Sequence, residues 1–260
     1  MAIRKVLLPL ISTGAGEAAL STAWTVAQLW NAHLVALHVQ MDLAPAPAMS
    51  AMFRHFTIEH KVSMAEAIAG AESATASFLT LTGHRLDILP QQARLADLTV
   101  VRHPATPEEV SSSAVLHAVL FDSGRPLLIA PQVMPTTVGR RICLGWNGSA
   151  ESAAAVEAAM PWLQRADAVR ILWAEEYQRH GPRAPDLQTY LAMHSVAADL
   201  MMFKPIDNIV GAGLLAAAKA FNCDLLVMGA YAHSRLRQQI LGGVTRHVLA
   251  HATLPVMMHR

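Results

Sequence analysis

The sequence predicts an α/β fold in which two similar, doubly wound parallel-sheet domains of Rossmann-like type follow one another along the chain. Three observations lead to this prediction: apolar runs of strand length alternate with Ala-rich helical segments, the two halves of the sequence resemble each other, and the composition suits a buried core. Hydrophobic residues make up 53% of the 260 residues and charged residues only 15%. Such a chain buries enough apolar surface to fold, which excludes a disordered protein.

The repeat is the observation that fixes the domain count. Residues 4–39 align without a gap on residues 140–175, at an offset of 136 (140 minus 4). Each copy contains a basic pair, an apolar run, a turn of small residues, an Ala-rich helical segment and a second apolar run. The ends of the halves also match, so we expect one domain at 1–133 and another at 139–260, joined by a Pro/Thr/Gly-containing linker.

The individual elements follow from apolar runs and their spacing. Runs at 6–11, 34–39 and 98–101 predict strands in the first half, and runs at 142–145 and 224–228 predict strands in the second. Nearly continuous apolar strands separated by helices indicate parallel strands with both sheet faces covered. Residues 41–56 contain several prolines and are expected to form a loop over the end of the sheet.

Composition also excludes several classes of partner. Lys and Arg (20) nearly balance Asp and Glu (19), which argues against duplex nucleic acid or an anionic membrane surface. No apolar run reaches the roughly 18 residues of a membrane span, and the first residues lack a signal-peptide cleavage site. Two cysteines at Cys143 and Cys223 fit a reducing compartment, where we expect a reduced, packed pair. The expectation is therefore a cytoplasmic protein.

The turn after the strand at 142–145 reads WNGSAES, residues 146–152. Asn, Gly and Ser at a strand-to-helix turn cap the following helix, and the amides of such a helix also suit an anion. Both interpretations stay open, because nearly every unit of this kind needs a capping turn. The matching turn of the first half begins with Ile11, which offers fewer ligand donors.

The segment after the strand at 224–228 is the second candidate. Gly229 permits close backbone approach, and the run Gly242-Gly243-Val244-Thr245 precedes an apolar helix, where its amides would cradle a phosphate. His233, Arg235, Arg237 and Arg246 add positive charge. The spacing is neither a Walker A loop, since no Lys follows the last glycines, nor a G-x-G-x-x-G motif.

This segment, DLLVMGAYAHSRLRQQILGGVTRHVLAHATLPV, resembles the nucleotide loop G-x2-G-x9-G-[S/T] of the universal stress protein family, and the resemblance to its tandem bacterial members spans nearly the whole chain. The resemblance implies an adenine nucleotide alpha hydrolase-like fold, with loop amides binding the ribose and phosphates of ATP or another adenine nucleotide. It also implies a residue after the first strand that binds ribose or Mg²⁺. The candidate ligand-binding residues are Asn147, Gly148, Gly229, Ala232, His233, Arg235, Gly242, Gly243, Val244 and Thr245.

Three positions depart from the family pattern. Ala232 replaces the second glycine, Gly243 replaces a Ser or Thr, and Asn147 replaces an acidic residue. The Ala232 methyl costs about 1 kcal/mol if that position needs a positive φ. Thr245 is a candidate for the lost hydroxyl, and Asn147 is a poorer Mg²⁺ ligand than a carboxylate.

The first half departs further from the pattern. Arg102 replaces the first glycine, no glycine occurs between it and Gly124, and Glu108 and Glu109 would bring negative charge to the phosphate position. We expect the first domain to keep the fold without binding nucleotide.

A metal site has weaker support. His247 and His251 lie four residues apart on a predicted helix, but HVLAH lacks the Glu of an H-E-x-x-H motif and no further ligand is marked nearby. We expect no metal centre of this type.

Three functions remain open at this level. The first is a universal stress protein with a signalling or stress-protective role that binds nucleotide in its second domain. The second is a non-binding scaffold or interaction protein of the same fold. The third is an adenylating enzyme, disfavoured because NGSAES lacks the second Gly and the Asp of S-G-G-x-D-S. We expect no catalytic residues. We expect protein partners, and a chain that is either a monomer whose two domains pair internally or a homodimer.

Overall fold

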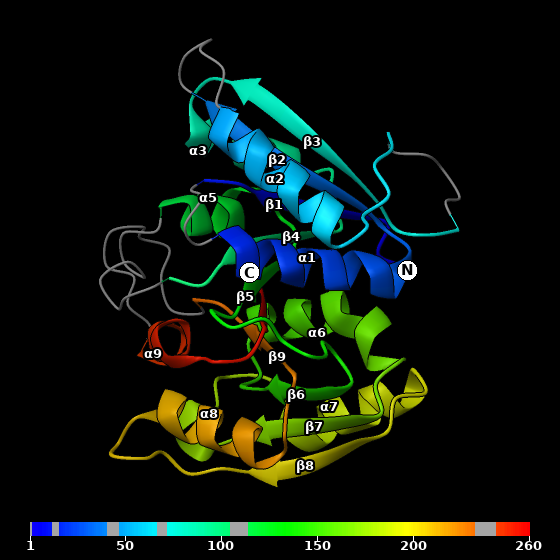
Figure 1. Cartoon of the computed structure of the whole chain (residues 1–260). Helices are drawn as coiled ribbons and strands as arrows, with labels where there is room; N and C mark the ends of the chain where they lie inside the picture. Colours follow the sequence, from blue (N-terminus) through cyan, green and yellow to red (C-terminus); the bar gives the residue numbers. More distant parts are fainter. Residues whose placement is uncertain (1, 12–15, 41–46, 67–71, 105–113, 232–242) are drawn as a thin grey trace. The chain divides into compact units, whose positions relative to one another are not determined.

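The computed structural model describes residues 2–11, 16–40, 47–66, 72–104, 114–231 and 243–260 (Figure 1). The chain divides into two compact units. The first comprises residues 1–103 and 113–134, and the second comprises residues 104–112 and 135–260. The domain limits of 1–133 and 139–260 stay a prediction.

The first unit is a five-stranded parallel sheet with strand order β3-β2-β1-β4-β5. Helices α1 and α2 cover one face of this sheet, and α3 and α5 contact each other on the opposite face (Figure 1). In chain order the elements are β1 (Lys5–Pro9), α1 (Gly16–Trp30), β2 (His33–Gln40), α2 (Pro47–Glu59), β3 (Thr75–Thr82), α3 (Arg85–Ala93), β4 (Leu98–Arg102), α5 (Ala114–Asp122) and β5 (Leu127–Ala130).

The second unit repeats this arrangement with strand order β10-β9-β6-β7-β8, also parallel. Its elements are β6 (Arg141–Gly145), α6 (Ala150–Leu163), β7 (Ala168–Trp173), the 3-10 helix η1 (Glu175–Tyr177), α7 (Ala184–Met193), β8 (Ala198–Met202), α8 (Val210–Ala220), β9 (Leu225–Gly229), α9 (Gly243–His251) and β10 (Val256–His259). The predicted α/β fold with parallel, doubly wound strands is confirmed.

The first strand of each unit lies between its second and fourth strands, so both of its edges are hydrogen-bonded within the sheet. The side chains of Val6, Leu7 and Leu8 in β1 are buried, as are those of Ile142 and Leu144 in β6. Helices cover both faces of a central strand, so consecutive residues on opposite faces are both removed from water. The strand order reverses direction beside β1 and beside β6, which makes these the topological switch points.

A carboxylate fixes the start of each central strand in the same way. Asp97 Oδ2 accepts hydrogen bonds from the Arg4 and Lys5 amides at 2.8 and 2.9 Å. Asp224 accepts from the Arg140 amide at 3.1 Å and from the Arg141 amide at 2.8 Å. Each Asp lies just before the fourth strand of its unit, so the same side chain aligns the first and fourth strands in both copies.

One expectation about the first unit is wrong. Residues 47–56 of the expected loop at 41–56 belong to helix α2 rather than to irregular structure, while 41–46 lie outside the described residues. Pro47 is the first residue of the helix, a position that tolerates proline because its missing amide has no helical partner. Met49, Phe53 and Phe56 follow at spacings of one helical turn and are buried. The prolines therefore mark the start of a helix.

The two cysteines form the expected reduced pair. Both are free, and the two thiols interact with each other. The Cys223 thiol lies 3.1 Å from the Leu225 carbonyl oxygen. The Cys143 thiol is buried, and its interaction with Cys223 together with burial raises its pKa above the ordinary range, so the thiol form is favoured.

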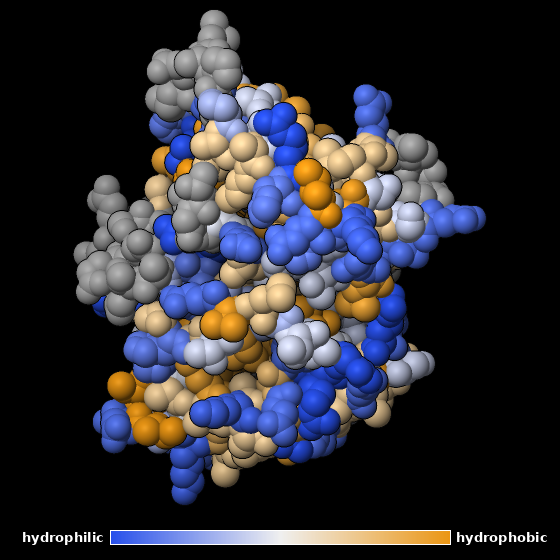
Figure 2. Space-filling view, in the orientation of Figure 1, coloured by the Kyte–Doolittle hydropathy of each residue, from blue (hydrophilic) through white to orange (hydrophobic). Residues whose placement is uncertain are grey.

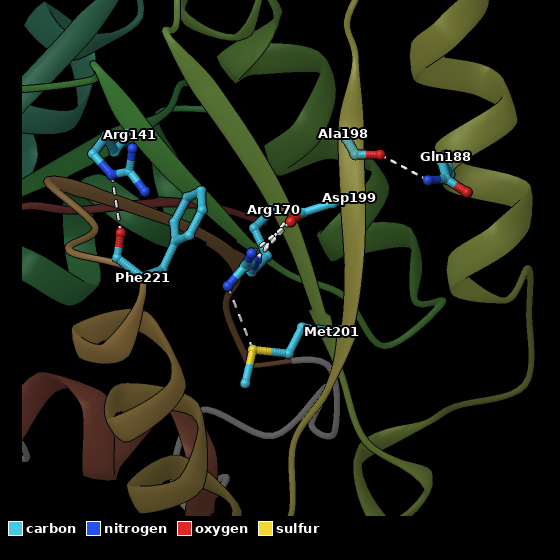
Figure 3. A network of polar contacts seen from close by, with 7 residues as sticks. All are labelled: Arg141, Arg170, Gln188, Ala198, Asp199, Met201 and Phe221. Atoms are coloured by element: carbon cyan, nitrogen blue, oxygen red, sulfur yellow. Dashed lines mark hydrogen bonds and ion pairs between the residues drawn. The ribbon is translucent and has the colours of Figure 1, made fainter.

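A polar network stabilises the amino end of the second-unit sheet (Figure 3). The Arg141 and Arg170 guanidinium groups both lie over the Phe221 ring, at 4.4 and 4.2 Å from its centroid. Arg170 also donates to both carboxylate oxygens of Asp199, with Nε at 3.0 Å from each. Arg141 Nε donates to the Phe221 carbonyl oxygen at 2.9 Å. The arginines at this end are therefore satisfied within the protein.

The surface shows no single dominant chemistry on the face drawn in Figure 2, where hydrophobic residues are scattered among hydrophilic ones. No helix in the described parts of the chain has both the length and the apolar character required to cross a bilayer.

Candidate functional site

The predicted ligand residues of the second unit belong to two segments that meet at one edge of the sheet. β6 and β9 are hydrogen-bonded neighbours, with Gly145 opposite Met228. The turn between β6 and α6 and the residues that follow β9 therefore leave the sheet side by side. Ligands of doubly wound sheets bind at this position, beyond the carboxyl ends of strands at the switch point.

Asn147 uses both of its oxygen atoms in hydrogen bonds within the protein. Its side chain is 5% exposed, and Oδ1 accepts a hydrogen bond from the Ser149 amide at 3.1 Å. Its main-chain oxygen accepts from the Arg179 amide at 2.7 Å. The side-chain oxygen that would meet a ribose hydroxyl or a metal ion thus already has a partner in the turn.

Gly148 is required by both its conformation and its surroundings. Its φ is +78°, and a Cβ built on it would lie 2.6 Å from Gln178 Nε2 and 2.7 Å from the Pro182 carbonyl oxygen. A side chain at this position would be strained and would collide with residues 178–183. We call residues 178–183, which lie between η1 and α7, the strap.

Ser149 confirms the capping interpretation of this turn. It is the N-cap of α6, and its hydroxyl accepts a hydrogen bond from the Ser152 amide at 3.2 Å. The Ser152 hydroxyl donates in return to the Ser149 carbonyl oxygen at 2.8 Å. One of the free amides of the first turn of α6 is therefore satisfied without a ligand.

Gly229 has a structural role that the sequence did not reveal. A Cβ built on it would lie 2.5 Å from the Ser152 nitrogen and 2.6 Å from the Glu151 carbonyl carbon. The end of β9 therefore approaches the backbone of α6 so closely that only glycine fits. The close approach predicted at this position is made by the protein's own helix.

The start of α9 is the most open part of the site. Gly243 is the first residue of the helix and is exposed, and a Cβ built on it would have no atom within 4 Å. Val244 is half-buried. Thr245 is buried, and its hydroxyl oxygen accepts a hydrogen bond from the Tyr231 amide at 3.4 Å. Thr245 thus connects α9 to the chain after β9, and its replacement of the lost Ser or Thr hydroxyl stays a prediction.

Tyr231 marks the exit from β9. It has a positive φ of 57°, and burial raises the pKa of its hydroxyl to about 12. Four predicted residues, Ala232, His233, Arg235 and Gly242, lie outside the described residues. The effect of the Ala232 substitution in the loop therefore stays a prediction.

The strap is the part of the site that sequence reasoning missed. Trp146 Nε1 donates to the Pro182 carbonyl oxygen at 3.0 Å, and Gln178 Nε2 donates to the Arg179 carbonyl oxygen at 3.0 Å. The available signal was the Gly181-Pro182 pair, which marks a turn a few residues beyond an apolar strand. The Gly181-Pro182 pair did not show that the strap would contact the β6–α6 turn.

The corresponding edge of the first unit is built differently. The His38 ring donates through Nδ1 to the Leu10 carbonyl oxygen at 3.0 Å, and His38 is buried. The Met52 side chain of α2 lies next to Gly16, where α1 begins. Glu108 and Glu109 lie outside the described residues, so the expected charge at this edge stays a prediction.

His247 and His251 stack on each other, with ring centroids 4.2 Å apart and planes inclined by 20°. His251 Nδ1 donates to the His247 carbonyl oxygen at 2.9 Å, and burial together with the charge of His251 lowers the pKa of His247. Within the parts of the chain described by the structure, no group of three or more His, Cys, Asp or Glu side chains is arranged to hold a metal ion.

Comparison with known families identifies the segment that contains β9 and α9. Residues 206–260 match the universal stress protein family. The match includes Gly229, Gly243, Val244 and Thr245, and it includes the loop that suggested a nucleotide site in the sequence. No curated protein sequence matches the chain.

Solved structures with this fold include universal stress proteins. One from Archaeoglobus fulgidus has a TM-score of 0.72 at 15% identity, covering 98% of this chain and 96% of that one. A functionally unknown protein from Pseudomonas aeruginosa has a TM-score of 0.64 at 17% identity, covering 99% and 92%. A putative universal stress protein from the same species has a TM-score of 0.62 at 18% identity, covering 99% and 93%. At these identities the likeness establishes the fold.

Proposed function

We propose that this protein has a universal stress protein role, in which the second unit binds an adenine nucleotide such as ATP and the bound state is signalled to a protein partner in the cytoplasm. The observation that carries the proposal is the family match of residues 206–260, because it spans the β9–α9 segment. In the structure this segment begins at the switch point beside β6, where doubly wound folds bind ligands.

The start of α9 supplies the physical basis for phosphate binding. The first amides of a helix lack helical partners and carry the positive end of the helix dipole. Gly243 is exposed and has open space around its Cα, so a phosphate group can approach these amides without meeting a side chain of that residue.

The described residues do not fit the Mg²⁺ ion that accompanies ATP in many proteins. Mg²⁺ prefers carboxylate and water oxygens in an octahedral shell. The position expected to supply a carboxylate is Asn147, whose Oδ1 accepts a hydrogen bond from the Ser149 amide. We therefore assign no role to Mg²⁺ at this residue.

The test is ATP binding by isothermal titration calorimetry, with Gly243→Asp as the discriminating variant. The new carboxylate would place negative charge at the start of α9 in open space, so we expect at least a tenfold weaker affinity with the fold retained. Thr189→Asp, at an exposed position of α7, is the matched control and should bind like the original chain. Lack of binding at millimolar ATP would refute the proposal.

A second candidate function has one specific observation in its favour. The strap covers the β6–α6 turn so closely that Gly148 and Gly181 contact each other through their backbones. A non-binding scaffold or interaction protein would use this contact simply to close the edge of the sheet. That function predicts that ATP leaves the melting temperature of the protein unchanged, whereas a stabilising ligand raises it in a concentration-dependent way.

We propose binding rather than turnover as the biological role. Release of phosphate from ATP, measured over hours with excess nucleotide, should remain at the level of a Gly243→Asp control. Multiple turnovers that depend on Gly243 would favour an enzyme instead.

A further inference from the structure

The strap holds the backbone of an arginine, Arg179, in a defined place at the candidate site. The Arg179 amide donates to the Asn147 carbonyl oxygen at 2.7 Å, and Gln178 Nε2 accompanies it by donating to the Arg179 carbonyl oxygen at 3.0 Å. Both main-chain polar groups of Arg179 are therefore bonded. The Arg179 backbone is fixed beside the β6–α6 turn.

Two glycines make this position possible. A Cβ built on Gly181 would overlap the carbonyl oxygen of Gly148, and a Cβ built on Gly148 would collide with Pro182. The strap can cross the turn only because neither residue has a side chain. This close crossing brings Arg179 to the carboxyl end of β6.

The Arg179 Nε lacks the kind of partner that other arginines of this unit have. This Nε is buried and forms no hydrogen bond within the described structure. By contrast, Arg170 is paired with Asp199 and Arg140 with Asp167 (Figure 3 shows the former). Shielding a donor from water without giving it an acceptor costs free energy, and an acceptor that reaches Arg179 Nε from outside would remove that cost.

The neighbouring groups do not neutralise the charge of Arg179. Asn147 is neutral where the resembling family has an acidic residue, and Glu175 and Glu176 are exposed on η1 without an ion pair to Arg179 among the described contacts. An acidic residue at 147 would favour a divalent cation, whereas a neutral amide at 147 and an arginine held beside the same turn favour an anion.

We propose that Arg179 is a phosphate-binding residue of the second unit and takes the place of a divalent cation, so that the ligand binds as its metal-free anion. This inference rests on the proposed nucleotide site. It adds Arg179 to the binding residues and specifies that the ligand binds without a metal ion. A guanidinium binds phosphate oxygens through charge-assisted hydrogen bonds in a planar arrangement. The position of the strap follows from Gly148 and Gly181.

The test uses inorganic tripolyphosphate and ATP as separate probes, each titrated calorimetrically in EDTA and in excess Mg²⁺. The original chain should bind both probes in EDTA at least as tightly as in Mg²⁺. Arg179→Gln should weaken tripolyphosphate binding roughly tenfold to hundredfold, the range expected for lost hydrogen bonds to a charged group. Arg179→Lys keeps the positive charge but loses the paired N–H donors of the guanidinium. Its affinity for tripolyphosphate should lie between those of the original chain and Arg179→Gln.

Arg165→Gln is the matched control, since it removes the same charge from an exposed residue beyond the far end of α6. It should bind like the original chain, and circular dichroism should show that every variant remains folded. The inference is overturned if Arg179→Gln binds tripolyphosphate like the original chain, if the original chain does not bind it, or if binding requires Mg²⁺.

The two probes separate this inference from the proposed function. Binding of ATP that is indifferent to Arg179 would reject the role of Arg179 and leave nucleotide binding standing. Binding of tripolyphosphate that depends on Arg179, with no gain in affinity for ATP, would support Arg179 and reject the adenine nucleotide.

Discussion

The two units share a strand order and the carboxylate that aligns their first strand, yet they differ at the carboxyl end of that strand. Asp97 and Asp224 play the same part in the two copies. After β1, a histidine ring hydrogen-bonds the Leu10 carbonyl oxygen. After β6, backbone of the strap contacts backbone of the turn through Gly148 and Gly181.

This difference shows which parts of a duplicated fold change independently. The amino end of the central strand must be aligned for the sheet to form, so both units keep the aspartate that accepts hydrogen bonds from two amides of this strand. The carboxyl end adds little to sheet formation, and its turn is therefore available for different chemistry. In the second unit that chemistry includes an arginine without a partner for its Nε.

The largest expected effect concerns the contact between Gly148 and Gly181 in the second unit. Gly181→Ala should lower the free energy of unfolding by about 3 kcal/mol, because the new methyl would overlap the Gly148 carbonyl oxygen, which is backbone. Urea denaturation measures the change. Gly124→Ala in the first unit, with a φ of +66° and no atom within 4 Å of the new Cβ, should cost only about 1 kcal/mol. Equal losses of stability in Gly181→Ala and Gly124→Ala would show that the backbone contact between Gly181 and Gly148 does not restrict residue 181.

The next effect tests the feature that the units share. Asp97→Ala and Asp224→Ala should each lower the free energy of unfolding by about 2 kcal/mol, because each leaves two strand amides without their acceptor. Thermal or urea denaturation of both variants checks this. Asp87→Ala, an exposed carboxylate of α3, should change stability by less than about 0.5 kcal/mol. A marked difference between the first two variants would show that the two aspartates are not equivalent.

A smaller effect is expected at the turn after β6. Asn147→Ala should lower stability by about 1 kcal/mol, because the Ser149 amide loses the acceptor that shapes the turn. Asn147→Asp keeps an oxygen in place and should remain within about 0.5 kcal/mol of the original chain in urea denaturation. Equal stability of all three proteins would mean that this hydrogen bond contributes nothing.

The smallest effect is the pH dependence contributed by His33 in the first unit. Burial, and secondly the charge of Lys5, lower the pKa of His33, whose ring nitrogens bond Thr75 and Ser77 at 2.8 and 2.9 Å. The unfolded chain therefore binds a proton more readily than the folded one. The stability contributed by neutral His33 is present above pH 6.5 and is lost as the pH falls below it.

His33→Gln should reduce the slope of stability against pH between about 6.5 and 5 by at most about one bound proton. Unfolding by urea at a series of pH values measures the slopes of the original chain and of His33→Gln, and a steeper slope in His33→Gln would show that the sign is wrong.

Much of the fold could be predicted because its signals are local. Runs such as 142–145 are apolar on consecutive residues, which is the pattern of a strand covered on both faces. The turn at Ser149 was recognisable as a cap for the same reason. The prolines at 41–47 misled the prediction, since a proline signals the first turn of a helix as well as a loop.

The candidate site was less predictable, because its contacts join residues distant in sequence. Gly229 was recognised as a place of close approach, but the chain does not encode locally that Ser152 is what approaches it. Arg179 carried no recognisable motif, and its significance depends on the Asn147 carbonyl oxygen that holds its amide.

The sequence by itself determined the parallel α/β fold and a glycine-containing segment that matches the universal stress protein family, since both depend on residue type and spacing along the chain. The tertiary structure alone decided that the strap crosses the β6–α6 turn at Gly148 and Gly181 and leaves Arg179 Nε without a partner. The reason is physical: backbone packing and the satisfaction of a buried donor are properties of groups brought together in space.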